Sequence, residues 1–267
     1  MNDWLHNLPL VWMALLIFGS TYLLTTAIYY IVTAVAVGEG RRHFKAVSPG
    51  ILPPLGILFG LFVAFTAAQV GSDNQLASAT VEREASALRS VVILASVLPS
   101  EPQTRLRTLI RDYIEETATH EWPMMAHRTV TAQIIPQSLA DALQLTLTLP
   151  AANEGQKIAQ REITTAVGAA LDARLQRISI SRSKVNGVKW STIFLSAVCS
   201  LIAIAMVHID NRVASVIIMM IFATGVAASV FLIFSHDRPF IGRISVGPDP
   251  LLQVMPQAEA AHPRTTP

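Results

Sequence analysis

Long runs of apolar residues without a single Asp, Glu, Lys or Arg divide this chain. Four such runs occur, at residues 4–38, 46–72, 190–209 and 213–236. A helix needs about 20 apolar residues to cross the hydrocarbon core of a bilayer, and a spanning segment in lipid must satisfy its own backbone hydrogen bonds. The pattern therefore predicts four membrane-spanning helices, at about residues 10–37, 51–70, 190–209 and 213–235.

Between the second and third runs, the pattern changes to helices with one apolar face. Apolar residues recur there every three or four positions, which is typical of a helix packed on one side. Three such series are Val81, Ala85, Leu88, Val92 and Ala95; Leu106, Leu109, Ile110, Tyr113 and Ile114; and Ile163, Val167, Leu171, Leu175 and Ile178. We expect a weaker helix at about 137–149, a continuation of the second span beyond Ser72, and the end of a helix at Trp122-Pro123.

These patterns together predict an all-α fold, an integral membrane protein with four transmembrane helices and a cytoplasmic helical bundle inserted between spans 2 and 3. The expected parts are an N-terminal transmembrane hairpin (1–72), a cytoplasmic helical segment (73–189), a C-terminal transmembrane hairpin (190–236) and a cytoplasmic tail (237–267). The tail is rich in proline and is expected to be disordered after about Val254. Four spans place both termini and segment 73–189 on the same side of the membrane.

Lys and Arg residues near the spans predict which side is cytoplasmic, because they are more frequent there. The nine on the side of segment 73–189 are Arg83, Arg89, Arg174, Arg177, Arg182, Lys184, Lys189, Arg238 and Arg243, and the four on the other side are Arg41, Arg42, Lys45 and Arg212. Three of the four cluster in one loop and favour the opposite orientation, but the count favours a cytoplasmic segment 73–189. We expect a multi-pass protein of a bacterial inner (plasma) membrane, in contact with lipid.

Composition narrows the possible functions. Charged residues make up 14% of the chain and hydrophobic residues 52%, against about 25% charged residues in ordinary soluble domains. A single soluble globule is therefore excluded. The net charge of +2 gives no reason to expect a nucleic-acid partner, and the single cysteine, Cys199, excludes a disulfide within the chain.

Two short motifs contain catalytic residue types at unsuitable spacings. His120-Glu121 and His127 are similar to a zinc-protease motif, but histidines that share a metal on a helix lie four positions apart, and these lie seven apart. Ser235-His236-Asp237 contains the residues of a hydrolase triad, but adjacent side chains point apart and do not form the relay. We therefore predict no enzyme activity, no catalytic residue, no metal site and no cofactor.

The second span carries two neighbouring ridges of different size. The small ridge is Gly56, Gly60, Ala64 and Ala68, and the bulky apolar ridge beside it is Ile57, Leu61 and Phe65, followed by the polar Gln69. Small ridges let helices approach closely in lipid. If several copies of this span surround an axis, the bulky ridge can form an apolar constriction that gates by dewetting. Alternatively, the small ridge packs against the other spans of its own chain.

Several segments resemble the bestrophin-like membrane family, a domain of unknown function related to bestrophin ion channels. They are Phe65-Thr-Ala-Ala-Gln-Val70 with Asp73, Val81-Glu-Arg-Glu-Ala85, and Asp237-Arg-Pro-Phe-Ile-Gly242 with Val246, Pro248 and Leu251. The resemblance covers about residues 45–255. It implies a pentameric ion channel whose second span lines the pore, with Ile57, Leu61 and Phe65 at the neck. Two features of bestrophins are missing: Gly71-Ser-Asp-Asn74 stands where they carry an Arg-Trp-Trp-like segment, and the acidic calcium clasp has no counterpart.

Two acidic residues lie just beyond the second span. Glu82 and Glu84 are candidates for setting the charge of a cytoplasmic vestibule, and the alternative is an ordinary solvated helix face. The leading hypothesis is a homo-oligomeric channel or pore, with a pentamer expected, that passes small inorganic ions. The alternative is a non-conducting, membrane-anchored scaffold or signalling protein, which a monomer with its second span enclosed by its own chain would support.

Overall fold

All regular structure in the described part of the chain is helical. The computed structural model describes residues 8–36, 47–127, 129–131, 133–183, 185–242 and 244–257, and no strand occurs among them. This confirms the prediction of an all-α fold.

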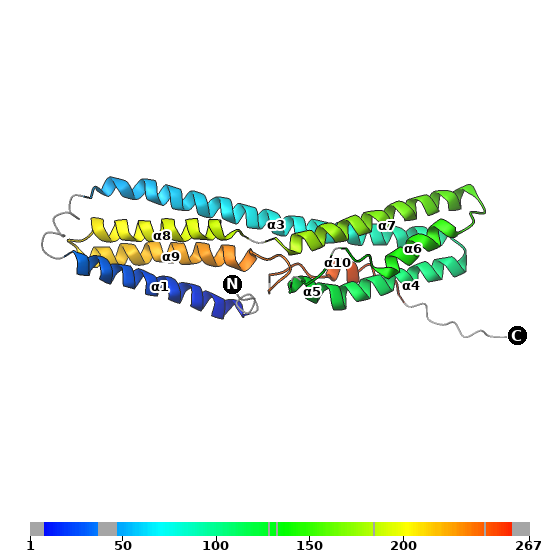
Figure 1. The fold of residues 1–267 in the computed structure, drawn as a ribbon, viewed down its shortest axis with the longest axis horizontal. Helices are drawn as coiled ribbons and strands as arrows, with labels where there is room; N and C mark the ends of the chain where they lie inside the picture. The colour runs from blue at the N-terminus through cyan, green and yellow to red at the C-terminus, as the bar shows by residue number, and fades with distance from the viewer. Residues whose placement is uncertain are drawn as a thin grey trace. The chain divides into compact units, whose positions relative to one another are not determined.

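Figure 1 labels the α-helices. They are α1 (Leu10–Val35), α3 (Leu52–Leu94), α4 (Ser100–Glu116), α5 (Trp122–Ala126), α6 (Gln137–Thr148), α7 (Glu154–Ser181), α8 (Gly187–Val207), α9 (Arg212–His236) and α10 (Asp249–Leu252). Two 3₁₀ turns, η2 (Pro49–Ile51) and η3 (Ala95–Val97), flank α3, and a π-helical turn, η4 (Thr117–Glu121), joins α4 to α5.

Four helices are long and apolar enough to cross a membrane, as predicted. They comprise α1, the helical stretch Pro49–Val97 that contains α3, α8 and α9. Pro53 and Pro54 lie in the first turn of α3, where a missing N–H leaves no hydrogen bond unmade. The helix then continues without interruption to Leu94, so the predicted continuation beyond Ser72 is confirmed.

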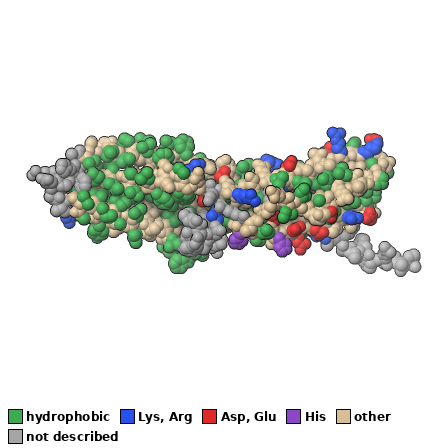
Figure 2. Space-filling model, in the orientation of Figure 1, with side chains coloured by type: hydrophobic (Ala, Val, Ile, Leu, Met, Phe, Trp, Pro, Cys, Tyr) green, Lys and Arg blue, Asp and Glu red, His purple; other side chains and the backbone are tan. Residues whose placement is uncertain are grey.

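The chain forms two compact units. Unit 1 comprises residues 1–74 and 184–245, and unit 2 comprises residues 75–183 and 246–267. Hydrophobic side chains cover the visible face of the long helices of unit 1, whereas acidic and basic side chains gather over the helices of unit 2 (Figure 2).

Two apolar clusters hold unit 1 together. The first joins α1, α8 and α9 through Ile28, Val32, Leu201, Ile204, Ala205 and Met219. The second joins α3, α8 and α9 through Phe59, Val70, Ile193, Ala197, Val226, Val230 and Ile233, with Val185 beside them. One side of α3 is therefore fixed against α8 and α9.

The interior of unit 2 follows most of the predicted apolar series. Val81, Ala85, Leu88 and Ala95 are buried, as are Leu106, Ile110, Tyr113 and Ile114. The prediction was wrong for Leu175, which is 44% exposed. Arg174 and Arg177 take the buried positions of α7 there, because ion pairs described below compensate their charge.

The prediction that Trp122-Pro123 ends a helix was wrong. The turn η4 is wider than an α-helix, with the N–H of Trp122 donating to the carbonyl of Thr117 five residues back. Pro123 then falls in the first turn of α5, where proline is tolerated. The chain stays helical to Ala126.

The C-terminal segment packs onto unit 2 as far as residue 257, so the predicted disorder after Val254 was wrong for residues 255–257. Leu251 is fully buried, and Trp122 Nε1 donates to the carbonyl of Val246 at 3.2 Å. Arg111 donates from Nε and Nη2 to the carbonyl of Pro256 at 2.9 and 2.7 Å, which fixes the end of the segment. Residues 258–267 lie outside the described residues.

Candidate functional site

The part of α3 in unit 1 has one packed side. Phe59 and Val70 are buried, and Phe62, Val63 and Ala67 pack against the same cluster. The ring of Phe59 lies 5.5 Å from that of Phe222 on α9, centroid to centroid. These contacts determine which side of α3 faces outward.

Both predicted ridges lie on the outward side. Ile57 is 69% exposed, Leu61 45% and Phe65 67%, and Gly56, Gly60, Ala64 and Ala68 are exposed as well. The alternative that the small ridge packs against the other spans of its own chain is therefore wrong. The small residues lie on the outer surface of the single chain.

The two glycines of the small ridge are not required by packing inside this chain. A methyl group added at Gly56 or Gly60 would meet no atom within 4 Å outside the helix itself. In a membrane, small residues matter where a second helix must approach closely. The open space in front of these glycines is suited to such a helix.

A polar contact lies just beyond Phe65, at the C-terminal end of the bulky ridge. Gln69 accepts a hydrogen bond from the ammonium group of Lys189 at the start of α8. Phe65, Thr66, Lys189 and Thr192 line a cavity of about 210 Å³ beside this contact. The three apolar side chains of the ridge are thus followed by a charged and hydrogen-bonded group.

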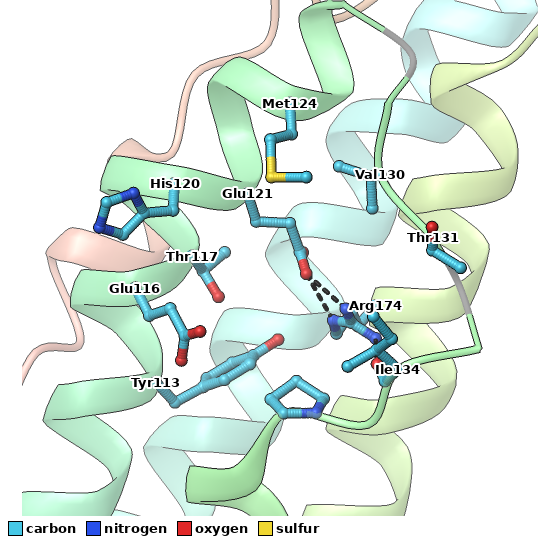
Figure 3. Close-up of a pocket in the computed structure, with 11 residues that line it drawn as sticks. Tyr113, Glu116, Thr117, His120, Glu121, Met124, Val130, Thr131, Ile134 and Arg174 are labelled. Atoms are coloured by element: carbon cyan, nitrogen blue, oxygen red, sulfur yellow. Dashed lines mark hydrogen bonds and ion pairs between the residues drawn. The ribbon is translucent and has the colours of Figure 1, made fainter.

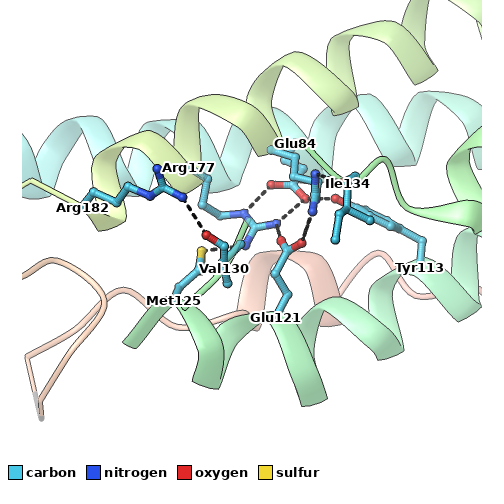
Figure 4. Close-up of polar contacts among 9 residues, drawn as sticks. Glu84, Tyr113, Glu121, Met125, Val130, Ile134, Arg177 and Arg182 are labelled. Carbon is cyan, nitrogen blue, oxygen red and sulfur yellow. Dashed lines mark hydrogen bonds and ion pairs between the residues drawn. The ribbon is translucent and has the colours of Figure 1, made fainter. Parts of the chain in front are cut away.

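Unit 2 contains a cluster of four charged side chains and one tyrosine, all of them buried except Glu121, which is partly exposed (Figure 4). Arg177 on α7 donates from Nε to Glu84 Oε2 at 2.7 Å and from Nη2 to Glu121 Oε1 at 2.6 Å. Arg174 lies 2.5 Å from Glu121 Oε2, and the hydroxyl of Tyr113 donates to Glu84 Oε1 at 2.5 Å. The cluster therefore joins α3, α4, η4 and α7.

The charges of this cluster balance, because two carboxylates face two guanidinium groups. Burial by itself lowers the pKa of Arg177, but Glu84 and the other partners more than offset it, so the pKa is raised and the residue stays protonated. Burial, together with the negative charge of Glu84, raises the pKa of Tyr113 well above its usual value. The cluster links α3, α4, η4 and α7, and each of its charged groups has a partner of opposite charge.

The π-helical turn places Glu121 in this cluster. Its extra residue shifts the register of the helix between α4 and α5, and both oxygens of Glu121 reach arginines of α7. Just beyond the turn, the ring of Trp122 lies 4.7 Å from the Arg177 guanidinium carbon, in a cation–π contact. Wide turns of this kind are often found at functional positions in helices.

Comparison with known proteins gives the family of the chain. The profile of the bestrophin-like domain matches residues 9–251. The chain belongs to the bestrophin-like family. The match includes the whole of α3 and all four candidate membrane helices, which together identify a membrane protein. No curated protein and no solved structure matches the chain.

The two acidic residues predicted near the end of the second span have different surroundings in this bestrophin-like chain. Glu82 is exposed, whereas Glu84 is fully buried and paired with Arg177. The prediction that Glu84 faces solvent, in a vestibule or on a solvated helix face, was therefore wrong. Glu84 lies three residues after Val81 and four before Leu88, which places it on the inward side of α3.

The motifs with catalytic residue types take part in other contacts. Glu121 binds the two arginines, beside a cavity of about 200 Å³ that Tyr113, Thr117 and Arg174 also line (Figure 3). Among the described residues, no three His, Cys, Asp or Glu side chains are grouped to hold a metal ion.

In the Ser235-His236-Asp237 motif, the first two side chains are in contact, although adjacent side chains were expected to point apart. Ser235 Oγ lies 2.9 Å from His236 Nδ1, and both groups also contact the carbonyl of Leu232. Asp237 Oδ1 accepts a hydrogen bond from the backbone N–H of Val185 at 2.7 Å, which ties the end of α9 to the segment before α8.

Sequence reasoning missed the buried arginines, although the signal was present. Arg174 follows Ala170 by four residues, and Arg177 follows Ala173 by four, so both continue the buried series of α7. Charged residues in phase with an apolar series indicate buried ion pairs. Their carboxylate partners, Glu84 and Glu121, however, come from distant parts of the chain and cannot be identified from periodicity alone.

Proposed function

We propose that this protein is an oligomeric channel that passes small inorganic ions passively, with copies of α3 side by side around a common axis. Ile57, Leu61 and Phe65 form its apolar neck. The small ridge of Gly56, Gly60, Ala64 and Ala68 lets neighbouring copies approach closely. Unit 2 and both termini lie on the cytoplasmic side, and the family resemblance favours five copies.

The proposal is carried by the exposure of both ridges in the single chain. A face that meets only lipid gains nothing from a series of small residues, because lipid chains adapt to any apolar surface. Two helices that pack in lipid need small residues to bring their backbones together. The outward position of the ridges therefore supports a second copy of the helix as their partner.

An apolar neck explains how such a pore would control flow. Narrow rings of apolar side chains expel water, and an ion that loses its water meets a barrier. Gln69 and Lys189, which follow the ridge, provide a polar environment in which an ion regains its water. Removing the bulky side chains should widen and wet the constriction.

The test is the triple substitution Ile57→Ala, Leu61→Ala and Phe65→Ala. We expect the conductance of purified protein in planar bilayers to rise several-fold, because the three apolar rings are lost. Ion substitution in the same recordings gives the selectivity.

A matched control lies on α9. Val213, Ile217 and Ile221 are also four residues apart, with exposures of 69%, 53% and 68%. Their replacement by Ala should leave the conductance unchanged. The proposal fails if neither the original protein nor the neck variant conducts, or if both triple variants change conductance equally.

A non-conducting scaffold gains no support from this structure. That alternative favours a monomer with its second span enclosed by the other spans, and the ridges are exposed instead. The detergent-corrected mass of the purified protein separates the two functions, because a ring of several copies favours the channel and a monomer favours the scaffold.

A further inference from the structure

The part of α3 in unit 2 also has an outward side, and it carries charge. Its exposed residues recur every three or four positions and are Gln75, Leu76, Ala79, Glu82, Arg83, Ser86, Arg89 and Ile93. The inward side, with Ala77, Val81, Ala85 and Leu88, is buried. At the middle of the outward side, an acidic and a basic residue are adjacent in the sequence.

Glu82 and Arg83 cannot pair with each other. Consecutive residues point about 100° apart around a helix and do not face one another. Glu82 is exposed and makes no hydrogen bond or ion pair with any described residue. Arg83 Nη1 donates a hydrogen bond to Gln176 Oε1 at 2.9 Å. The other N–H groups of its guanidinium remain available to a partner. The helix therefore presents opposite charges on two sides at nearly the same height.

This arrangement suits a ring of identical copies. Copies that insert into a membrane in the same orientation are related by rotation about an axis across it, so one side of each copy meets the other side of the next. Two such sides of one subunit are about 90° apart in a ring of four and about 108° apart in a ring of five. The angle of about 100° between Glu82 and Arg83 falls between these values.

We infer that Glu82 of one copy forms an ion pair with Arg83 of the next copy around the ring. The inference rests on the proposed oligomer. It names a contact between neighbouring copies that lies outside the predicted neck. Glu82 and Arg83 differ by about 1.5 Å along the helix axis, so neighbouring copies need almost no vertical shift to pair. Ala79 and Ser86 then lie between the two contacts and face the axis. Each pair cancels its own charge, which leaves this part of the passage lined by small, neutral side chains.

Cysteine cross-linking tests the geometry in the full-length protein. Cys199 is the single cysteine of the chain and is first replaced by Ala. The double variant Glu82→Cys, Arg83→Cys, oxidised with copper phenanthroline in detergent, should give a ladder of covalent species up to the size of the ring on a denaturing gel. Each single variant should give at most a dimer. An oligomer by mass that yields no ladder overturns the ion pair and leaves the channel proposal intact, whereas a monomer by mass overturns both.

Charge exchange tests the energetics. Glu82→Arg or Arg83→Glu alone places like charges at every contact, and the protein concentration for half-assembly should rise at least about 5-fold. The double variant Glu82→Arg, Arg83→Glu restores opposite charges and should recover assembly. The adjacent, exposed pair Arg161 and Glu162 on α7 gives the control, because exchanging these two should not change assembly. Single variants that assemble as well as the original protein, or a double variant that assembles no better than the single ones, would overturn the ion pair.

Discussion

Four buried side chains and the partly exposed Glu121 show how charge is stabilised inside unit 2; the buried ones are Glu84, Tyr113, Arg174 and Arg177. Moving an ion pair out of water is costly, and the pair remains favourable only when its hydrogen bonds are complete. Here Arg177 contacts both carboxylates, Arg174 contacts one, and Tyr113 adds a donor. Removal of one member would leave a buried charge uncompensated, so the cluster determines how α3, α4, η4 and α7 come together.

Tyr113→Phe gives a prediction with a defined pH dependence. Because the folded protein raises the pKa of Tyr113, the unfolded chain releases the phenolic proton first. The stability from this group is complete below about pH 10, the usual pKa of tyrosine, and is lost as the pH rises through the folded value. The variant should lose about 1.5–3 kcal/mol at pH 7, since a hydrogen bond to a charged group disappears.

The measurement is thermal unfolding in detergent, followed by circular dichroism at pH 7 and above pH 10. Above pH 10 the original protein should lose stability more steeply than the variant. Tyr30→Phe, at an exposed tyrosine of α1, controls for the loss of a phenol. Parallel pH curves for the original protein and Tyr113→Phe would contradict the proposed role of the hydroxyl.

At the scale of elements, α3 is the helix on which the functional proposals meet. In unit 1 its inner side packs on α8 and α9 and its outer side carries the small and bulky ridges. In unit 2 its inner side carries Glu84 and its outer side carries Glu82 and Arg83. One helix thus supplies internal packing and, in our proposal, the contact between copies along its whole length.

Gly60→Leu separates these two roles. Gly60 is exposed and a Cβ atom added there meets nothing within 4 Å, so the helix content and unfolding temperature of the subunit should be kept. The bulky side chain should nevertheless prevent the close approach of a second α3, and the oligomer should dissociate to smaller species.

Gly225→Leu is the matched control for this substitution. Gly225 is an exposed glycine of α9, and a methyl group there also meets nothing within 4 Å. It should leave the detergent-corrected mass unchanged. A Gly60→Leu protein that keeps the mass of the original oligomer would place the contact between copies elsewhere.

At the scale of the whole molecule, the orientation in the membrane stays a prediction. Two of the nine basic residues counted for the cytoplasmic side, Arg174 and Arg177, are buried in ion pairs and are not free to interact with the membrane surface. Lys184, Arg243 and the loop residues Arg41, Arg42 and Lys45 lie outside the described residues. Without Arg174 and Arg177, the Lys and Arg residues on the side of unit 2 still outnumber the four on the other side, which favours unit 2 on the cytoplasmic side.

Cysteine labelling in bacterial cells tests this orientation, in the Cys199→Ala background. Arg212→Cys lies at the exposed start of α9, and Lys157→Cys lies at an exposed position of α7. An impermeant maleimide should label Arg212→Cys in intact spheroplasts and Lys157→Cys only after the membrane is opened. The reverse pattern would place unit 2 outside the cytoplasm.

The helical fold, the four candidate membrane helices and the two ridges of α3 could all be predicted from the amino-acid pattern. Each is a local property, because apolar length and a period of three to four residues depend on neighbours along the chain. The apolar series of Val81 and Leu106 were predictable for the same reason. The bulky residues of the proposed neck and the small residues of the neighbouring ridge could be identified from their four-residue spacing in the same way.

Two features depend on the folded chain: which side of α3 faces outward, and which charges are buried. The packed side is set by Phe59 and Val70 against α8 and α9, which lie more than a hundred residues away in the chain. The pairing of Glu84 with Arg177 likewise depends on two helices that meet only after folding. The wide turn at Glu121 and the packing of the C-terminal segment also depend on distant partners. A periodic pattern shows that a face exists, but the partner that covers it is determined by contacts across the fold.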